Sequence, residues 1–340
     1  MDDEVVSSKH HNLEDIARLS GVSRSTVSRV INQHPNVSEK TRQRVLQVID
    51  QVDFHPNLAA RALVTQKLNV IGILIPHIVS KVFSDPFFPL LLQSITNTAN
   101  QMGYSVTLWL TSTEGDSDDI LGQVVNHRLM DGLIVASTVV DESFIQKLDE
   151  RGKPFVIIGS PNRLDPHVNY VDVENEIGGY LLTQHMIKQQ RQRIAHIPGL
   201  EKLRSSRDRQ AGYLRAIHEA GMDAIIAPPG NFSEEGGYRS MQVLLDQQVD
   251  AVFCASDIMA IGAMQAIRAA GLCMPNDIAI GGFDDIHQAA LTNPPLTTVH
   301  QPILRLGEVA TEGIISILDG RVETSFHQIL PVELIIRQSA

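Results

Sequence analysis

Three polar side chains that lie close together in the sequence, Arg24, Ser25 and Arg29, are of the types that read DNA bases. An arginine can donate two hydrogen bonds to O6 and N7 of a guanine, and a serine hydroxyl can bond to several base edges. The apolar residues Val27 and Val30 repeat with helical spacing in the same stretch, which predicts that these polar groups lie on a short helix. This combination indicates sequence-specific hydrogen bonding in the major groove of DNA.

A second set of candidates lies where predicted strands end. Asp85 is followed by Phe87 and Phe88 at the start of a predicted helix, and Asp284 ends an apolar strand that begins at Ile278. Carboxylates accept hydrogen bonds and aromatic rings stack on flat faces, so this set suits a sugar or a base as ligand. The alternative for the two phenylalanines is simple packing inside the domain.

Arg207 follows a strand predicted to end at Pro198, and it brings several hydrogen-bond donors in a fixed fork. Together with Asp284, which only accepts, it would match a hydroxyl-rich ligand bound between them. The neighbouring charges Asp208 and Arg209 are interpreted as solvated.

The sequence offers little for catalysis. It contains no G-x-S-x-G nucleophile elbow, H-E-x-x-H zinc motif or Walker-type phosphate loop. Asp284 and Asp285 could be read as an acid and base pair, but adjacent carboxylates at a strand end point apart. Cys254 and Cys273 form neither a disulfide framework nor a metal-binding spacing. We therefore expect no catalytic residue, no metal site and no cofactor.

The elements that would position the base-reading groups form a helix-turn-helix. Apolar residues in 13–17 and 27–31 indicate two short helices, and Gly21 lies between them, where a tight turn needs a residue without a Cβ. Asn12 and Ser23 are placed to cap these helices. The second helix of such a unit enters the major groove. The alternative is a small helical bundle with ordinary caps.

A third helix is predicted after Ser38, which would cap it. Its buried stripe would consist of Val45, Val48, Ile49 and Val52. Short polar groups at helix ends can contact phosphates and so fix the register on DNA without reading sequence. The residues expected to do this are Asn32, Ser38 and Thr41.

The segment that follows, 56–63, is rich in helix-favouring residues but too short to be a stable helix alone. We expect it to fold on contact with DNA. Its alanines would allow close helix pairing, and Leu63 could wedge between base pairs from the minor groove. The alternative is a plain linker with a buried leucine.

From Asn69 onward, short β-branched runs alternate with amphipathic stretches. This alternation predicts parallel sheets covered by helices on both faces, arranged as two doubly wound lobes. The strand candidates are 70–75, 105–110, 132–136, 155–158, 170–173, 194–197, 251–254, 278–281 and 328–336. The helix candidates are 89–102, 176–188, 207–220, 259–270 and 304–318.

Charge is distributed unevenly along the chain, whose formal net charge is −11. Residues 9–63 hold eight Lys and Arg against five Asp and Glu, whereas residues 64–340 hold twenty against thirty-one. The positive charge therefore lies where DNA phosphates would be bound. No apolar run is long enough to span a bilayer, and the acidic amino terminus is unlike a signal peptide, so we expect a cytoplasmic protein.

The chain closely resembles the lactose-repressor (LacI) family of transcriptional regulators. The resemblance covers residues from about 12 to the end, and it includes the order of headpiece, hinge and sugar-binding-type core. It rests on the motifs Gly21-Val22-Ser23, Thr26-Val27-Ser28-Arg29-Val30-Ile31-Asn32, Pro56-Asn57, Ala60-Arg61-Ala62-Leu63, Asp131-Gly132-Leu133-Ile134, Ser256-Asp257, Gly282-Phe283-Asp284-Asp285 and Pro295-Leu296-Thr297-Thr298-Val299.

The resemblance implies a headpiece in 1–55, a hinge in 56–68 and an effector-binding and dimerisation core in 69–340. The core would have one lobe of about 69–169 plus 300–327 and another of about 170–299 plus 328–340. The DNA-binding residues would be Asn12, Ser23, Arg24, Ser25, Ser28, Arg29, Asn32, Ser38, Thr41, Asn57, Ala60 and Leu63.

The resemblance places the family's effector-binding arginine at Arg207 and its ligand-binding acid at Asp284. Sugar-responsive members often have Asn in place of Ser256, so the site is expected to differ from the galactoside type. The complete set of expected effector contacts is Asp85, Phe87, Phe88, Arg207, Ser256, Asp257 and Asp284.

These features predict a DNA-binding transcriptional regulator, expected to be a repressor, whose affinity for a pseudo-palindromic operator is controlled by a small polar effector. A sugar is the first expectation, and a purine or nucleoside effector or corepressor is the alternative. An extracytoplasmic solute-binding protein would share the core but not the headpiece. No leucine-heptad helix follows the last predicted strand, so a homodimer is expected rather than a tetramer.

Overall fold

A computed structural model describes residues 11–31, 35–52, 54, 67–111, 122–124, 126, 130–136, 142–161, 167–322 and 325–340. The chain divides into two compact units, Met1–Leu68 and Asn69–Ala340. Among the described residues, no helix has the length and apolar character needed to cross a membrane. Four residues expected to contact DNA lie outside the described residues: Asn32, Asn57, Ala60 and Leu63.

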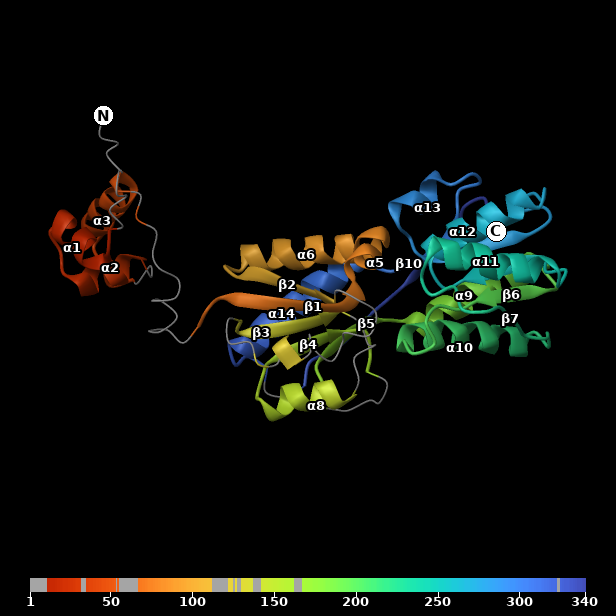
Figure 1. Ribbon diagram of the computed structural model, residues 1–340, viewed down its shortest axis with the longest axis horizontal. Coiled ribbons are helices and arrows are strands. Elements are labelled where there is room, and N and C mark those ends of the chain that lie inside the picture. The colour runs from red at the N-terminus through yellow and green to blue at the C-terminus, as the bar shows by residue number, and fades with distance from the viewer. Residues whose placement is uncertain are drawn as a thin grey trace, which may run out of the picture. The chain divides into compact units, whose positions relative to one another are not determined.

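The described residues of the first unit form three short helices, α1 (Leu13–Ser20), α2 (Arg24–Ile31) and α3 (Glu39–Gln51), which are labelled in Figure 1. Gly21 ends α1 in the left-handed conformation, with φ of 64°, which lets the chain turn sharply into α2. The helices enclose a small core made of Ile16, Ala17, Val27, Val30, Val45 and Phe54. The predicted helix-turn-helix and third helix are therefore confirmed.

Side-chain caps start these helices as the sequence predicts. The Asn12 side chain accepts hydrogen bonds from the first turn of α1 and forms a capping box with Asp15. The Ser23 hydroxyl accepts from the Thr26 backbone N–H at 3.2 Å, and Ser38 caps α3 in the same way through Thr41. Each cap satisfies a backbone donor that has no partner inside its helix.

The first lobe of the second unit is built on a six-stranded sheet in the order β11-β5-β4-β3-β1-β2. All the strand pairs in this sheet are parallel. Its strands are β1 (Val70–Ile78), β2 (Ser105–Thr111), β3 (Gly132–Ala136), β4 (Phe155–Ile158), β5 (Tyr170–Val173) and β11 (His327–Leu330). Its described helices include α5 (Val79–Ser84), α6 (Phe87–Gln101), α8 (Glu142–Glu150) and α14 (Ile303–Leu318).

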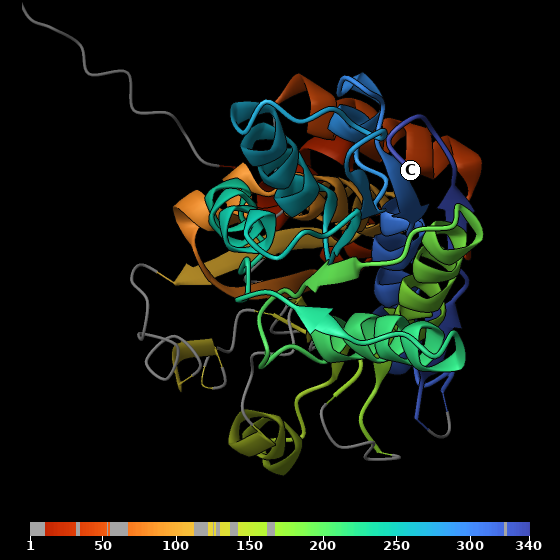
Figure 2. The ribbon, with the colours of Figure 1, turned by 90° about the vertical axis from the view of Figure 1, so that its right-hand side faces the viewer.

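The second lobe has a sheet in the order β12-β10-β9-β8-β6-β7, parallel except for the antiparallel pair of β10 with β12. Figure 2 shows α9 and α10 on one side of this sheet and α11 and α12 on the other. Its strands are β6 (Ile194–Ile197), β7 (Ile225–Ile226), β8 (Ala251–Cys254), β9 (Ala279–Asp284), β10 (Thr297–His300) and β12 (Glu333–Ile335). Its helices are α9 (Asn175–Lys188), α10 (Arg204–Glu219), α11 (Glu234–Leu245), α12 (Asp257–Ala269) and α13 (His287–Leu291). The predicted two-lobed α/β architecture is confirmed.

The chain crosses between the lobes three times, after β5, after β10 and after β11. Two of these crossings come a few residues later than expected, because β5 and β11 both pair within the first sheet. The predicted single strand over 328–336 is wrong. Two strands in different sheets replace it, separated at Pro331, which has no backbone N–H to continue a ladder.

Glycines allow α9 and α10 to pack backbone against backbone. A Cβ on Gly212 of α10 would overlap the carbonyl oxygen of Glu176, and a Cβ on Gly179 of α9 would overlap the carbonyl oxygen of Arg209. The neighbouring atoms are backbone, so they cannot rotate away as a flexible side chain would. This contact fixes the position of Arg209 relative to α9.

We expect Gly212→Ala to destabilise the second unit by about 1–3 kcal/mol, because the added methyl group must push two helix backbones apart. Gly122→Ala is the matched control, since a Cβ there meets no atom within 4 Å. Urea unfolding followed by the fluorescence of the single tryptophan, Trp109, measures both changes. Equal unfolding midpoints for Gly212→Ala and the wild type would contradict this account of the helix contact.

Candidate DNA-binding surface and effector pocket

The second helix of the headpiece presents one polar face. Arg24, Ser25 and Arg29 are exposed, and Ser28 is partly exposed. Positions 24, 25, 28 and 29 share a side of the helix because they are separated by about one turn. Val27 on the other side is fully buried. These four polar side chains are therefore available together to a partner such as DNA.

Arg24 forms an ion pair that is weak enough to be exchanged. Its Nη1 atom lies 3.5 Å from Oε1 of Glu14 on α1, and both side chains are about two-thirds exposed. Exposed pairs of this kind contribute roughly 0.2–1 kcal/mol. A guanine or a phosphate can therefore replace Glu14 as the partner of Arg24 at small cost.

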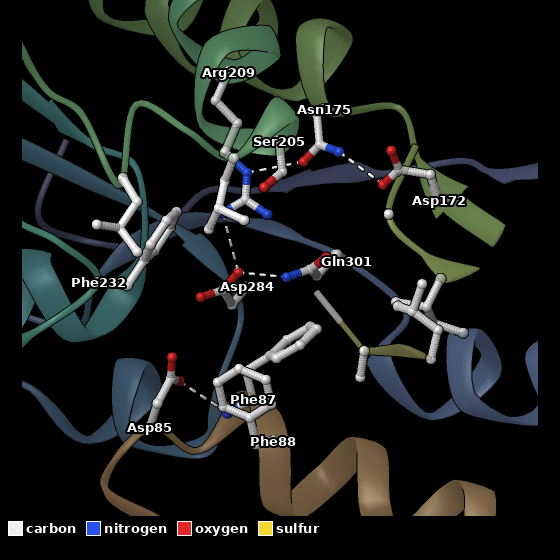
Figure 3. Close-up of a pocket in the computed structure, with 16 residues that line it drawn as sticks. Asp85, Phe87, Phe88, Asp172, Asn175, Ser205, Arg209, Phe232, Asp284 and Gln301 are labelled. Atoms are coloured by element: carbon white, nitrogen blue, oxygen red, sulfur yellow. Dashed lines mark hydrogen bonds and ion pairs between the residues drawn. The ribbon is translucent and has the colours of Figure 1, made fainter. Parts of the chain in front are cut away.

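The second unit contains a cavity between its two lobes, shown in Figure 3. The empty space at this site, including open solvent at its mouth, amounts to about 780 Å³. Three phenylalanines, Phe87, Phe88 and Phe232, line part of it. The polar lining consists of Asp85, Asp172, Asn175, Ser205, Arg209, Asp284 and Gln301.

A buried chain of hydrogen bonds runs through the wall of this cavity (Figure 3). Asn175 donates to Asp172 at 2.9 Å and accepts from Nε of Arg209, also at 2.9 Å. Nη1 of Arg209 lies 3.4 Å from the Asp284 carboxylate, which also accepts from Gln301 at 2.5 Å. Asp172 and Asn175 flank the first crossing between the lobes, and Gln301 lies in the second. The chain therefore connects two crossings through one arginine.

The expectation that Arg207 faces Asp284 is wrong for this structure. Arg207 is exposed and is not among the cavity-lining residues, whereas Arg209, interpreted as a solvated charge, is only 5% exposed and pairs with Asp284. Helix α10 begins at Arg204, so the two arginines differ by about 200° around its axis. The helix therefore turns Arg209, and not Arg207, toward the cavity, and the sequence did not reveal this orientation.

Ser256 and Asp257 also lie outside the cavity lining. Ser256 caps α12, and its hydroxyl accepts from the Met259 N–H at 3.4 Å. Asp257 is fully buried, where it accepts from the Thr298 hydroxyl at 2.5 Å and the Ile286 N–H at 2.9 Å. In this structure both residues support the end of the second sheet. The cavity does include Asp85, Phe87, Phe88 and Asp284, as the sequence analysis expected.

Sequence reasoning missed most of the polar wall, namely Asp172, Asn175, Ser205, Arg209 and Gln301. Asp172 lies inside an apolar strand, and Asn175 and Gln301 lie in connections whose place beside the cavity depends on the tertiary fold. Only Arg209 carried a usable signal, because its i,i+4 spacing from Ser205 puts both on one helix face.

Burial determines the electrostatics beneath the cavity. It raises the pKa of Asp284 to about 7, although the nearby Arg209 guanidinium acts in the opposite direction. Burial also raises the pKa of Asp257 well above its usual value, and the charge of Asp284 adds to this effect. For Arg209, burial lowers the pKa despite its acidic neighbours. The described residues contain no group of three or more His, Cys, Asp or Glu arranged to hold a metal ion.

Comparisons with known proteins agree with this architecture. Residues 12–57 match the bacterial regulatory proteins of the lacI family, and residues 183–340 match a periplasmic binding protein-like domain. The HTH-type transcriptional regulator CelR of Thermobifida fusca is 34% identical over 332 residues, covering 96% of this chain and 97% of CelR. The HTH-type transcriptional repressor PurR of Aliivibrio salmonicida (strain LFI1238) is 32% identical over 324 residues, covering 93% of each protein.

Solved structures resemble this one over nearly the whole chain. A CelR–cellobiose complex has a TM-score of 0.75 and 30% identity, covering 97% of this chain and 100% of that one. A lac repressor dimer bound to operator and the anti-inducer ONPF has a TM-score of 0.85 and 26% identity, covering 97% and 99%.

A helix-turn-helix unit followed by a two-lobed core with a polar cavity defines the class of ligand-responsive, DNA-binding transcriptional regulators. The extent of the sequence matches identifies the group within that class. The chain belongs to the LacI family of bacterial regulatory proteins.

The raised pKa of Asp284 predicts a measurable pH dependence of stability. An unfolded aspartate has a pKa near 3.8, so between pH 4 and 7 the folded protein holds a proton at Asp284 that the unfolded chain has released. The contribution of Asp284 to the unfolding free energy must therefore fall as the pH rises through this window. Asp284→Asn lacks the titrating group, so its unfolding free energy should decline less between pH 4.5 and 7.5.

Urea unfolding of the full chain at several pH values, followed by Trp109 fluorescence, measures this slope. Asp149→Asn, at an exposed position on α8, is the control and should keep the wild-type slope. Parallel pH profiles for Asp284→Asn and the wild type would show that Asp284 titrates at an ordinary pKa in the folded protein.

Proposed function

We propose that this regulator binds a small sugar in the cavity between its lobes and that binding changes its affinity for a pseudo-palindromic operator. The observation that carries the proposal is the buried chain Asp172–Asn175–Arg209–Asp284–Gln301, which borders the cavity and joins two interlobe crossings. A ligand that alters these hydrogen bonds changes how the lobes are held, and a change of this kind can be passed to a DNA-binding unit.

The chemistry of the cavity supports a sugar. Phe87 and Phe88 pack edge to face, with their ring centroids 5.3 Å apart, and offer apolar surface for the C–H face of a sugar ring. The carboxylates of Asp85 and Asp284 offer acceptors for hydroxyl groups, and Arg209 offers donors. CelR, a relative over the whole chain, has been solved in complex with cellobiose.

A purine is the second candidate, and two observations favour it. Aromatic side chains beside polar groups also suit a flat heterocycle, and PurR is among the relatives at 32% identity. A thermal-shift screen of sugars and nucleobases distinguishes the candidates, because a specific ligand raises the unfolding temperature of the core.

On the DNA side, we propose that a homodimer places two copies of α2 in successive major grooves. Arg24, Ser25 and Arg29 would read bases, and Ser28 would lie beside them on the same face. Asn12, Ser23, Ser38 and Thr41 stand at helix ends, where backbone N–H groups and short side chains suit phosphate contacts. Function on DNA implies a cytoplasmic location, and the pocket is proposed to bind its ligand without catalysing a reaction.

The repressor proposal has a direct prediction for base readout. Arg24→Ala and Ser25→Ala should change the preferred half-site, because each lost base contact removes roughly 1–3 kcal/mol of discrimination. Selection from a pool of randomised half-sites measures the preference. Thr41→Ala is the comparison variant, and it should weaken binding to all sites alike. An unchanged preference after both base-reading substitutions would show that these residues do not read sequence.

A second prediction separates the two arginines of α10. Arg209→Lys keeps the charge but loses the fork that holds Asn175 and Asp284, so ligand affinity should fall by about 1–3 kcal/mol. Arg207→Ala removes a larger part of an exposed side chain and should leave ligand affinity nearly unchanged. Calorimetry with the hits of the thermal-shift screen gives the affinities.

Operator binding measured in parallel tests whether the effect is specific. Both variants should bind operator without ligand, because neither residue belongs to the headpiece, but only Arg207→Ala should respond normally to ligand. A full ligand response in Arg209→Lys together with a lost response in Arg207→Ala would return the effector role to Arg207.

A further inference from the structure

We propose that the effector pocket selects an uncharged saccharide and rejects anionic ligands such as phosphorylated or carboxylated sugars, with Asp85 as a specificity-determining residue. The inference rests on the proposed sugar effector and adds the charge of that effector. The selectivity follows from the charged groups that line the cavity and from the hydrogen-bond and ion-pair partners of these groups.

The charged lining is predominantly acidic. Among the lining residues that the structure describes, Asp85, Asp172 and Asp284 carry carboxylates, Arg209 is the one cationic side chain, and no lysine or histidine is present. Figure 3 shows the three carboxylates on different sides of the cavity. An anionic ligand would therefore meet carboxylates on several sides, and repulsion from those that are ionised would oppose its binding.

Arg209 is poorly placed to act as an anion receptor. Its Nε and Nη1 atoms donate to the Asn175 side chain at 2.9 Å and to the Ala255 carbonyl at 2.6 Å. Nη1 also lies 3.4 Å from the Asp284 carboxylate, and the guanidinium carbon lies 3.6 Å from the centre of the Phe283 ring. These contacts offset the positive charge of Arg209 inside the wall, and its Nη2 group, which takes part in none of them, can still donate to a ligand hydroxyl.

Asp85 also occupies the place where a helix would otherwise attract an anion. Helix α6 begins at Phe87, and helix amino termini favour phosphates because their backbone N–H groups lack partners. Oδ1 of Asp85 accepts from the Phe87 N–H at 3.1 Å, so the protein supplies its own negative group at this position. A phosphate approaching α6 would have to displace a carboxylate that is covalently part of the chain.

The titration of Asp284 supports the same conclusion. The nearby charge of Asp85 already raises the pKa of Asp284, in addition to the larger effect of burial. Another negative charge in the cavity would raise this pKa further, so an anionic ligand would bind together with a proton at Asp284 and more weakly as the pH rises. A hydroxyl group has the opposite effect, because it donates a hydrogen bond to a carboxylate without adding charge.

Calorimetry on the full-length protein with matched sugars tests the proposal. The probes are three neutral sugars with their anionic counterparts: glucose with glucuronate, ribose with ribose 5-phosphate, and cellobiose with its C6-oxidised uronate. For the neutral sugar that binds, we expect its anionic counterpart to bind at least about 100-fold more weakly. Glucosamine is the control, because it carries a substituent on the glucose ring with a positive rather than a negative charge. The acidic lining should tolerate this positive charge.

The variant Asp85→Asn should reduce the discrimination between neutral and anionic partners by about tenfold, while its amide oxygen can still accept from Phe87. Asp149→Asn removes the same charge from the exposed surface of α8 and should leave the discrimination unchanged. Together these variants separate the local effect of Asp85 from a general change in net charge.

Tighter binding of an anionic partner would overturn this inference alone, and it would direct attention to the amino end of α10, whose cap makes no side-chain hydrogen bond. Equal rejection of glucosamine and glucuronate would also overturn it, because the discrimination would then be steric. If none of the sugars bound while a nucleobase did, the proposed sugar effector would fail, and this inference would fail with it.

Discussion

The buried ion pair between Arg209 and Asp284 is the interaction on which the organisation of the core depends. Both side chains are nearly inaccessible to water, and removing Asp284 would leave the Arg209 charge buried without this partner, which is far more destabilising than the loss of an exposed pair. The surroundings supply what such a pair needs, with Asn175 and Ala255 on Arg209 and Gln301 on Asp284. Glycine contacts between α9 and α10 hold the arginine backbone where the pair can form.

Because of its position, this ion pair can affect both the contacts with a ligand and the contacts between the lobes. The pair borders the cavity, where a ligand can touch it, and its partners lie in segments that pass from one lobe to the other. A ligand can change how the lobes are held together by changing a few hydrogen bonds, because a buried polar network has few alternative arrangements. Regulation in this account therefore requires only that the ligand favour one arrangement over the other.

The sequence predicted the architecture well where local chemistry decides it. The caps at Asn12, Ser23 and Ser38 and most strands of both lobes were predicted correctly, because capping groups and buried apolar runs are local signals. Positions that depend on helix phase or on the tertiary path were not predictable. Two residues along α10 separate Arg207 from Arg209, and an error of a few residues at the helix start reverses which of them faces inward. Asn175 and Gln301 could be assigned to the cavity only from the path that the chain takes between the lobes.

The central claim is that the cavity and the DNA-binding surface are energetically coupled. Measuring the affinity for an effector sugar in the absence and in the presence of saturating operator tests it directly, because coupling between two sites must be reciprocal. Operator is expected to change the sugar affinity by the same factor by which the sugar changes the operator affinity. Identical sugar affinities with and without operator would contradict it.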